Sequence, residues 1–257
     1  MNWEAVDLSI LGPALLAGIL VTATHVPLGQ RVLARGIIFL DLAVAQVAGL
    51  GLIAAHSFHR EPGGWQVQVI AMLAAIAGVL ILNYTDKRWP DIQEALIGSL
   101  FVLAASGSIL LLATHPQGGE QLKDLLVGQI LWVSYQQLIP TTILYCIVLI
   151  IWYQFAQRAS SLYFYLLFAV TITTSVQLVG VYLVFATLIL PALAIRSLKA
   201  FSVTYGYIIS IVGYIAGLLL AALLDLPAGA MVVYTLAVTS LVIGQLLSKQ
   251  SKLTQEK

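Results

Sequence analysis

One predominantly apolar stretch, residues 162–198, limits what this chain can fold into more than any other feature. It is 37 residues long. As a single α-helix it would measure about 55 Å at 1.5 Å per residue, whereas the hydrocarbon core of a membrane is about 30 Å thick. The stretch must therefore break, and the polar residues 171–177 together with Gly180 predict where.

The composition agrees with a chain that is mostly inside a membrane. Hydrophobic residues make up 60% and charged residues only 9%, with a mean hydropathy of +0.98, whereas soluble domains carry about 25% charged residues. The net charge of +1 indicates no nucleic-acid partner. The single Cys146 excludes a disulfide framework, and no GxxxxGK phosphate-binding loop is present. We therefore predict an all-α polytopic membrane protein that is not itself an enzyme.

We expect one membrane-spanning domain over residues 1–257, with eight to nine transmembrane or re-entrant helices and a solvated cytoplasmic tail at residues 248–257. Residues 125–134 are too few to cross a membrane, which takes about 20, so they predict an interfacial or re-entrant helix. The predicted spans are residues 8–26 (closed by Pro27), 36–55, 66–84, 92–114, 138–155, two halves of 162–198, 203–224 and 226–247.

The lysines and arginines test this number of spans. If residues 162–198 cross twice and the N-terminus faces out, ten of the twelve basic residues face the cytoplasm, and only Arg60 and Lys123 face out. A single crossing splits the twelve seven to five. The positive-inside rule therefore favours nine apolar passes with a cytoplasmic C-terminus, although a re-entrant pair would give the same sidedness.

Asp41 is the candidate functional residue, because no Lys, Arg or other acid lies between Gly36 and Arg60. A carboxylate inside a membrane span costs roughly 2.5–3.5 kcal/mol and marks a functional site by default. It could bind a cation or proton on a transport path, or it could be protonated or paired with Arg35 and hold helices together. Gln46 could coordinate a metal through its carbonyl oxygen or make a helix–helix hydrogen bond. The two residues are five apart, about 140° around a helix, so sharing one face requires a bend or a π-bulge.

Two weaker patterns remain. His56 and His59 lie three apart at a predicted outer loop, where they could relay metal or simply be solvated. None of the four histidines pairs with another at i, i+4 within a span, which excludes that type of zinc site. Ala45 and Gly49 are four apart in the span of Asp41 and predict close packing against another helix.

Four stretches in order resemble the integral-membrane subunits of ABC importers for zinc, manganese and iron(II), and a fifth falls where that family carries an arginine-rich lead, Gly-Asp and then a His; the resemblance covers nearly the whole chain. The clearest likeness is VGVYLVFATLILPALA. The others occur in the family's order and at compatible spacing. The stretches are residues 179–194, EALIG at 94–98, LVGQILWVS at 126–134, LDLPAGAMVV at 224–233, and RGIIFLDLAVAQVAGLG at 35–51.

The resemblance implies a permease subunit in the inner membrane that pairs with a second permease copy. It also implies a cytoplasmic ATP-binding subunit, on which ATP hydrolysis takes place, and an extracytoplasmic metal-binding protein. The divalent metal is cargo, and no resident cofactor is expected. Asp41 and Gln46 would line the path, and Gly180 and Pro191 would shape a broken helix beside it, as in other transporters. Gly and Pro are also simply frequent in membrane helices.

The sequence departs from the family pattern in two places. The acid stands one position earlier, at Asp41, and Gln46 stands where the family has a histidine; carboxylate and amide oxygens suit harder ions than imidazole does. The cytoplasmic segment that docks on the ATPase is shortened to residues 154–161, so contact could involve Arg158, Lys87 and Arg88. This short segment favours an alternative function, an ATPase-independent secondary transporter or channel that uses Asp41 as its coupling group.

Overall fold

All regular structure in the described part of the computed structural model is helical, which confirms the predicted fold class. The structure describes residues 7–58, 64–112, 118–155, 161–196, 198 and 202–255. Seven helices there are long and apolar enough to cross a membrane, and Leu40–Ala55 and Val181–Ile195 are shorter apolar helices. The elements are α1 Leu8–Arg35, α2 Leu40–Phe58, α3 Gly64–Arg88, η2 Pro90–Ile92, α4 Gln93–Leu112, α5 Gly118–Val127, η3 Ile130–Trp132, α6 Tyr135–Phe155, α7 Ser161–Val179, α8 Val181–Ile195, α9 Ser202–Leu224 and α10 Ala228–Gln255.

The long apolar stretch breaks at Gly180, as predicted. Helix α7 ends at Val179 and α8 begins at Val181. Gly180 itself has φ +83°, a left-handed conformation that glycine adopts without steric cost. The backbone can therefore end one helix and begin the next within a single residue.

The chain divides into two compact units. Unit 1 contains residues 1–35, 127–145 and 178–257, and unit 2 contains residues 36–126 and 146–177. Helices α1, α8, α9 and α10 therefore belong to unit 1, whereas α2, α3 and α4 belong to unit 2. The single permease domain predicted for residues 1–257 stays a prediction.

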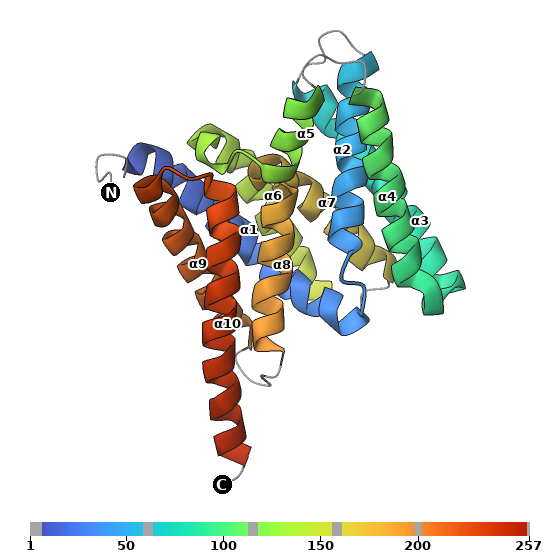
Figure 1. The fold of residues 1–257 in the computed structure, drawn as a ribbon. Helices are drawn as coiled ribbons and strands as arrows, with labels where there is room; N and C mark the ends of the chain where they lie inside the picture. The colour runs from blue at the N-terminus through green and yellow to red at the C-terminus, as the bar shows by residue number, and fades with distance from the viewer. Residues whose placement is uncertain are drawn as a thin grey trace. The chain divides into compact units, whose positions relative to one another are not determined.

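In unit 1, α9 and α10 form an antiparallel pair that lies side by side in Figure 1. Gly213 packs on Leu236 and Gly217 on Val232, which lets the two backbones approach closely. The Thr235 hydroxyl donates a hydrogen bond to the Gly213 carbonyl at 2.7 Å. Helix α8 packs along α10, and α1 packs against α8 and α9.

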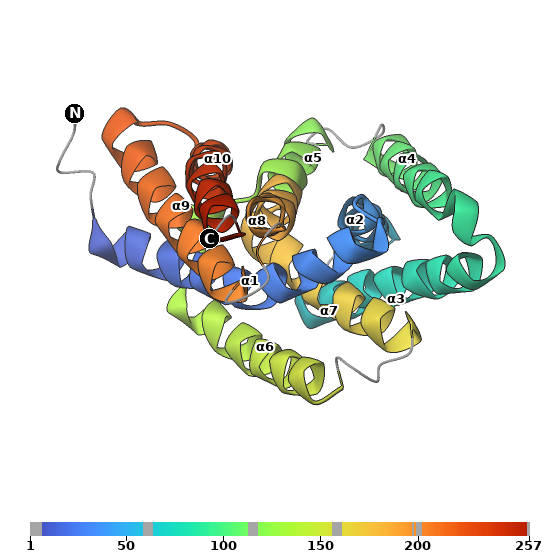
Figure 2. The same cartoon turned by 90° about the horizontal axis from the view of Figure 1, so that it is seen from below.

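In unit 2, α2 packs against both α3 and α4 (Figure 2). Gly51 contacts Ala74, and Val47 contacts Gly78, so α3 runs antiparallel to α2. Gly107 of α4 contacts Leu50. Small residues at these positions suit helices held together by close van der Waals packing in a membrane.

The prediction that Pro27 ends the first span is wrong, because α1 continues through it to Arg35. Proline has no N–H to donate to the carbonyl four residues earlier, which is that of Ala23. The Tyr207 hydroxyl of α9 donates a hydrogen bond to that carbonyl at 3.2 Å. A residue 180 positions away thus replaces the missing donor, and sequence periodicity could not reveal it.

Three other predicted boundaries also differ. The second span begins at Leu40 instead of Gly36, because Gly36 is left-handed with φ +70° and ends the preceding helix. The short helix α5 lies at Gly118–Val127, mostly before the predicted residues 125–134. Helix α10 reaches Gln255, so most of the predicted tail is helical, in keeping with the helix propensity of its Lys, Gln and Leu residues.

Candidate functional site

Asp41 lies in the first turn of α2, not in the middle of a span. It is only 1% exposed, and neither carboxylate oxygen has a hydrogen-bond partner among the described residues. The pairing with Arg35 considered from the sequence stays a prediction, because Arg35 belongs to unit 1 and Asp41 to unit 2. Free N–H groups at a helix N-terminus favour negative charge. Since a buried carboxylate without a partner is costly, this group can accept a cation or a proton.

Gln46 lies on a different face of the same helix. Because α2 is a regular α-helix over Leu40–Phe58, the five-residue spacing keeps Gln46 about 140° from Asp41. Gln46 is 3% exposed, and its Oε1 has no hydrogen-bond partner in the described ranges. The two residues therefore offer two separate buried acceptors. Their roles on a path stay predictions.

The predicted close packing at Gly49 is present. A Cβ atom added there would lie 2.6 Å from Leu125 Cδ2 of α5, so α5 packs directly on this face of α2. Ala45 is 1% exposed on the same helix. Gly49 thus leaves room for the Leu125 side chain beside α2.

Two residues in the first turn of α4, Gln93 and Glu94, make hydrogen bonds to α3 and to the residue just before α2. Glu94 Oε1 accepts a hydrogen bond from the Phe39 N–H at 3.3 Å, just before α2 begins. Gln93 Nε2 donates to the Leu82 carbonyl of α3 at 2.9 Å, and the Thr85 hydroxyl donates to Gln93 Oε1 at 2.9 Å. The first bond holds the residue just before α2, and the other two hold the start of α4 against the end of α3. Sequence reasoning noted Glu94 in the EALIG stretch but did not assign it this role.

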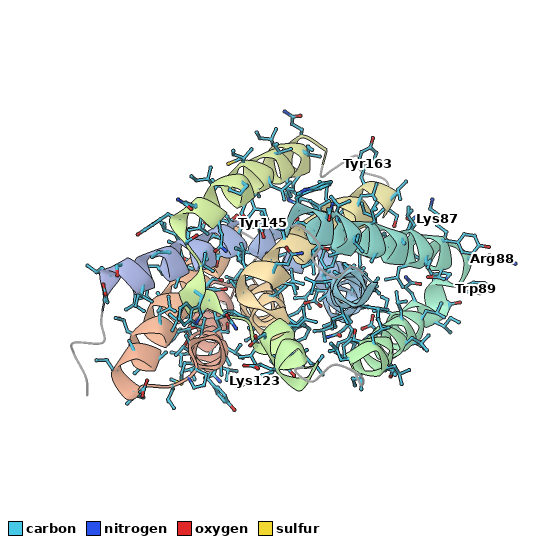
Figure 3. All side chains as sticks on the ribbon, turned by 90° about the horizontal axis from the view of Figure 1, so that it is seen from above. Lys87, Arg88, Trp89, Lys123, Tyr145 and Tyr163 are labelled. Carbon is cyan, nitrogen blue, oxygen red and sulfur yellow. The ribbon has the colours of Figure 1, made fainter. Side chains whose placement is uncertain are left out.

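The basic residues predicted to contact a partner are partly described. Lys87 and Arg88 form the last turn of α3 and are exposed, and Figure 3 shows them with Trp89 at the turn between α3 and α4. The Arg88 guanidinium lies 5.8 Å from the Trp89 ring centroid. Arg158 lies outside the described residues.

In unit 1, glycines of three of the resembling stretches meet. Gly128 is left-handed with φ +73° and contacts the backbone of Val179 and Gly180. A Cβ atom on Gly229 would lie 2.7 Å from the Val127 carbonyl oxygen. Side chains at Gly128 or Gly180 would overlap this backbone contact, so the three stretches encode one junction between the end of α5 and the starts of α8 and α10.

Pro191 does not break a helix, because α8 runs through it from Val181 to Ile195. It is buried in unit 1. Only Gly180 has the helix-breaking role that was predicted for both residues. Within the described ranges, no group of three or more His, Cys, Asp or Glu residues could hold a metal ion.

Sequence reasoning missed His25. The side chain is fully buried in α1, with an exposed fraction of 0%. Its Nδ1 lies 2.9 Å from the Val21 carbonyl oxygen. The spacing Gly18, Thr22, His25 and Gly29 places these four residues on one side of the helix, a signal that was available in the sequence.

The helices and the buried carboxylate define a polytopic membrane protein with a polar group inside its bundle. The model of the ABC 3 transport family matches residues 7–160 and 153–247. The chain therefore belongs to the ABC 3 transport family, which confirms the resemblance seen in the sequence.

Two curated relatives match most of the chain. A membrane protein of a probable metal transport system from Chlamydia trachomatis is 26% identical over 251 residues, covering 87% of this chain and 84% of the relative. An uncharacterized membrane protein of the ycf23-apcF intergenic region in Cyanophora paradoxa is 25% identical, covering 95% and 85%.

Two solved structures share the fold. A chain of PsaBC from Streptococcus pneumoniae, in complex with Fab, has a TM-score of 0.76 at 18% identity, with 95% of each chain covered. A chain from an inward-facing metal-chelate type ABC transporter has a TM-score of 0.67 at 14% identity, covering 96% of this chain and 89% of that chain. At sequence identities this low, the likeness shows a shared fold alone.

Proposed function

We propose that the chain is the membrane-spanning permease subunit of an ATP-driven importer for divalent metal ions: zinc, or manganese or iron(II). The buried Asp41 carboxylate, with both oxygens lacking partners in the described structure, is the observation that carries this proposal. Membership of an ABC transport family and a relative assigned to a metal transport system support it.

In this proposal two copies of the chain form the path, and alternating access is driven by a cytoplasmic ATP-binding subunit. An extracytoplasmic metal-binding protein delivers the ion. Asp41 neutralises part of the metal's charge, while the Gln46 carbonyl oxygen offers a second, separate contact along α2. Oxygen donors favour harder ions than imidazole does, which makes manganese or iron(II) a better fit to these two residues than tightly bound zinc. Lys87 and Arg88 are proposed partner contacts, and the C-terminus is proposed to be cytoplasmic.

The test is reconstitution of the chain in proteoliposomes with its ATP-binding and metal-binding partners. Uptake of zinc, manganese and iron(II) and metal-stimulated ATPase activity are measured for the native chain and for Asp41→Asn, which keeps the side-chain shape and removes the charge. We expect uptake to fall at least tenfold, equivalent to about 1.4 kcal/mol. Asp225→Asn is the matched control, because Asp225 is exposed and Asn tolerates its φ of +53°. Unchanged uptake in Asp41→Asn would remove Asp41 from the path.

The alternative is an ATPase-independent transporter or channel that uses Asp41 as a coupling group. The short connection between Phe155 at the end of α6 and Ser161 at the start of α7 favours it. Co-purification with an ATP-binding subunit discriminates between the two. Uptake that follows a proton gradient and needs no ATP would support the alternative and exclude the importer.

A further inference from the structure

His25 has the local arrangement of a histidine that binds a metal. Its Nδ1 lies 2.9 Å from the Val21 carbonyl oxygen, and a carbonyl oxygen can only accept a hydrogen bond. The tautomer protonated at Nδ1 satisfies this contact by donating to the carbonyl. In the neutral ring Nε2 then presents its lone pair, and this atom has no hydrogen-bond partner in the described part of the chain.

Metal-binding histidines usually donate their other ring N–H to a carboxylate, a backbone carbonyl or water, which fixes the tautomer and makes the ring a better ligand. The Val21 carbonyl does this for His25. The Thr24 hydroxyl, 3.0 Å from Nδ1 and 3.1 Å from the same carbonyl, restricts the ring further. The orientation of the imidazole is thus set before any ligand arrives.

A second polar atom without a partner lies on the same side of α1. Thr22 is 1% exposed, and its Oγ1 has no hydrogen-bond partner among residues of known placement. Residues three apart are neighbours on a helix surface. Thr22 Oγ1 and His25 Nε2 are therefore buried, unused polar atoms of two residues that neighbour each other on α1.

Glycines on either side of this pair face the neighbouring helices of unit 1. Gly18 lies against the ring of Tyr214 in α9, and Gly29 lies against the Leu188 carbonyl of α8. Because residues 18, 22, 25 and 29 share one side of the helix, Thr22 and His25 face the packed interior between α1, α8 and α9. Their free donor atoms consequently point into protein, where an unpaired polar atom costs about 1–3 kcal/mol.

We propose that His25 Nε2 and Thr22 Oγ1 form a binding position for a divalent transition-metal ion within unit 1. This class of ion is proposed because imidazole binds zinc, iron, nickel and copper well. That the bound ion is the transported one rests on the proposed function. This position offers an imidazole nitrogen, a type of metal ligand that is absent at Gln46. Its two residues belong to unit 1, whereas Asp41 belongs to unit 2.

The test uses the full chain in lipid nanodiscs, purified through a tag without histidine. His56, His59 and His115 are replaced by Ala, so that His25 is the only imidazole. Zn²⁺ alone is titrated and followed by ¹⁵N NMR of the labelled histidine ring, and Co²⁺ alone is followed by its visible absorption. We expect Zn²⁺ to shift the Nε2 resonance while Nδ1 stays protonated, and Co²⁺ to give a spectrum with one nitrogen ligand.

Four variants sharpen the result. His25→Gln keeps a polar side chain but removes the imidazole, and should weaken Zn²⁺ binding at least tenfold. Thr22→Val should weaken it several-fold, whereas Thr22→Ser should restore it. Ser210→Ala is the matched control, because it deletes a buried hydroxyl of the same unit that already donates to the Gly206 carbonyl; Zn²⁺ binding should not change.

Three outcomes would overturn this inference. One is equal Zn²⁺ affinity in a His25→Gln variant whose thermal unfolding shows that it is folded. Another is an Nε2 resonance that does not move at saturating Zn²⁺. A third is an Nε2 that is hydrogen-bonded only to a buried water, a common way to satisfy such an atom. Asp41→Asn separates this inference from the proposed function. If the variant loses uptake but binds Zn²⁺ at His25 as before, the result bears on the transport path alone. If Zn²⁺ binding at His25 is lost while uptake stays normal, the result bears on this site alone.

Discussion

The continuation of α1 through Pro27 makes a specific prediction about Tyr207. The Tyr207 hydroxyl donates to the Ala23 carbonyl at 3.2 Å, which is the carbonyl that a residue other than proline at position 27 would use. Tyr207→Phe removes this donor and keeps the ring. The Ala23 carbonyl is then left without the donor that replaces the missing N–H.

The size of the effect follows from the cost of one hydrogen bond. Hydrogen bonds between membrane helices are worth about 0.6 kcal/mol on average and up to about 1.7, and an unsatisfied buried acceptor costs about 1–3 kcal/mol. We expect Tyr207→Phe to lower the free energy of unfolding by about 0.6–1.7 kcal/mol. In a Pro27→Ala background the new N–H of residue 27 bonds to Ala23, so the same substitution should cost no more than about 0.5 kcal/mol.

The measurement is a double-mutant cycle by reversible denaturant unfolding in mixed micelles, with the native chain, both single variants and the double variant. Tyr205→Phe is the control, because it makes the same chemical change two residues earlier in α9, beside the cluster of Val26, Ile195 and Ile209. Equal cost of Tyr207→Phe with and without Pro27 would refute the argument that this hydroxyl replaces the proline's missing donor.

Three further predictions concern other parts of the chain. Gly180→Ala should lower the free energy of unfolding, followed by thermal unfolding, by about 2–4 kcal/mol, because it combines a left-handed φ of +83° with overpacking. Gly98→Ala is its control and should be neutral or slightly stabilising, because a Cβ at Gly98 meets nothing within 4 Å. Gln93→Leu should speed hydrogen exchange at the turn between α3 and α4, and unchanged exchange would contradict the bracing role of its amide. The Ser9 N–H donates to the Asp7 carboxylate at 2.8 Å, and this bond lowers the pKa of Asp7. The protection of the Ser9 amide against hydrogen exchange should be full above about pH 4 and should fall as the pH drops through the lowered pKa. Asp7→Ala should abolish this pH dependence.

The positions of the helices were largely predictable because apolar run length and breakers are local properties. The break at Gly180 followed from comparing 37 residues with the thickness of a membrane. The error at Pro27 has a tertiary cause, since the donor that rescues the helix comes from Tyr207 in α9. The early start predicted for α2 has a local cause, because Gly36 was counted as helical although it is left-handed.

The candidate site was predictable as residue types, not as geometry. Asp41 was identified because an acid in an apolar run is costly, but the hydrogen bond that Glu94 of α4 accepts from the Phe39 N–H, just before α2, was not predictable from the sequence. The five-residue spacing already separated Asp41 from Gln46 on a regular helix, and α2 is regular. The spacing of Gly18, Thr22, His25 and Gly29 could have directed attention to His25, but only the structure shows that its Nε2 has no hydrogen-bond partner in the described residues.

The resembling stretches of the sequence indicated the family. By itself the sequence also determined an all-helical membrane protein and the break at Gly180, and it selected Asp41 as the candidate functional residue. These follow from hydrophobic run length, charge and glycine's conformational freedom, which are properties of neighbouring residues. The tertiary structure decided which polar atoms are satisfied: Ala23 receives a bond from Tyr207, while Asp41, Gln46 and His25 keep atoms without partners in the described structure. Hydrogen bonding between distant segments depends on how helices pack, so only the folded chain distinguishes a structural polar group from one available for a ligand.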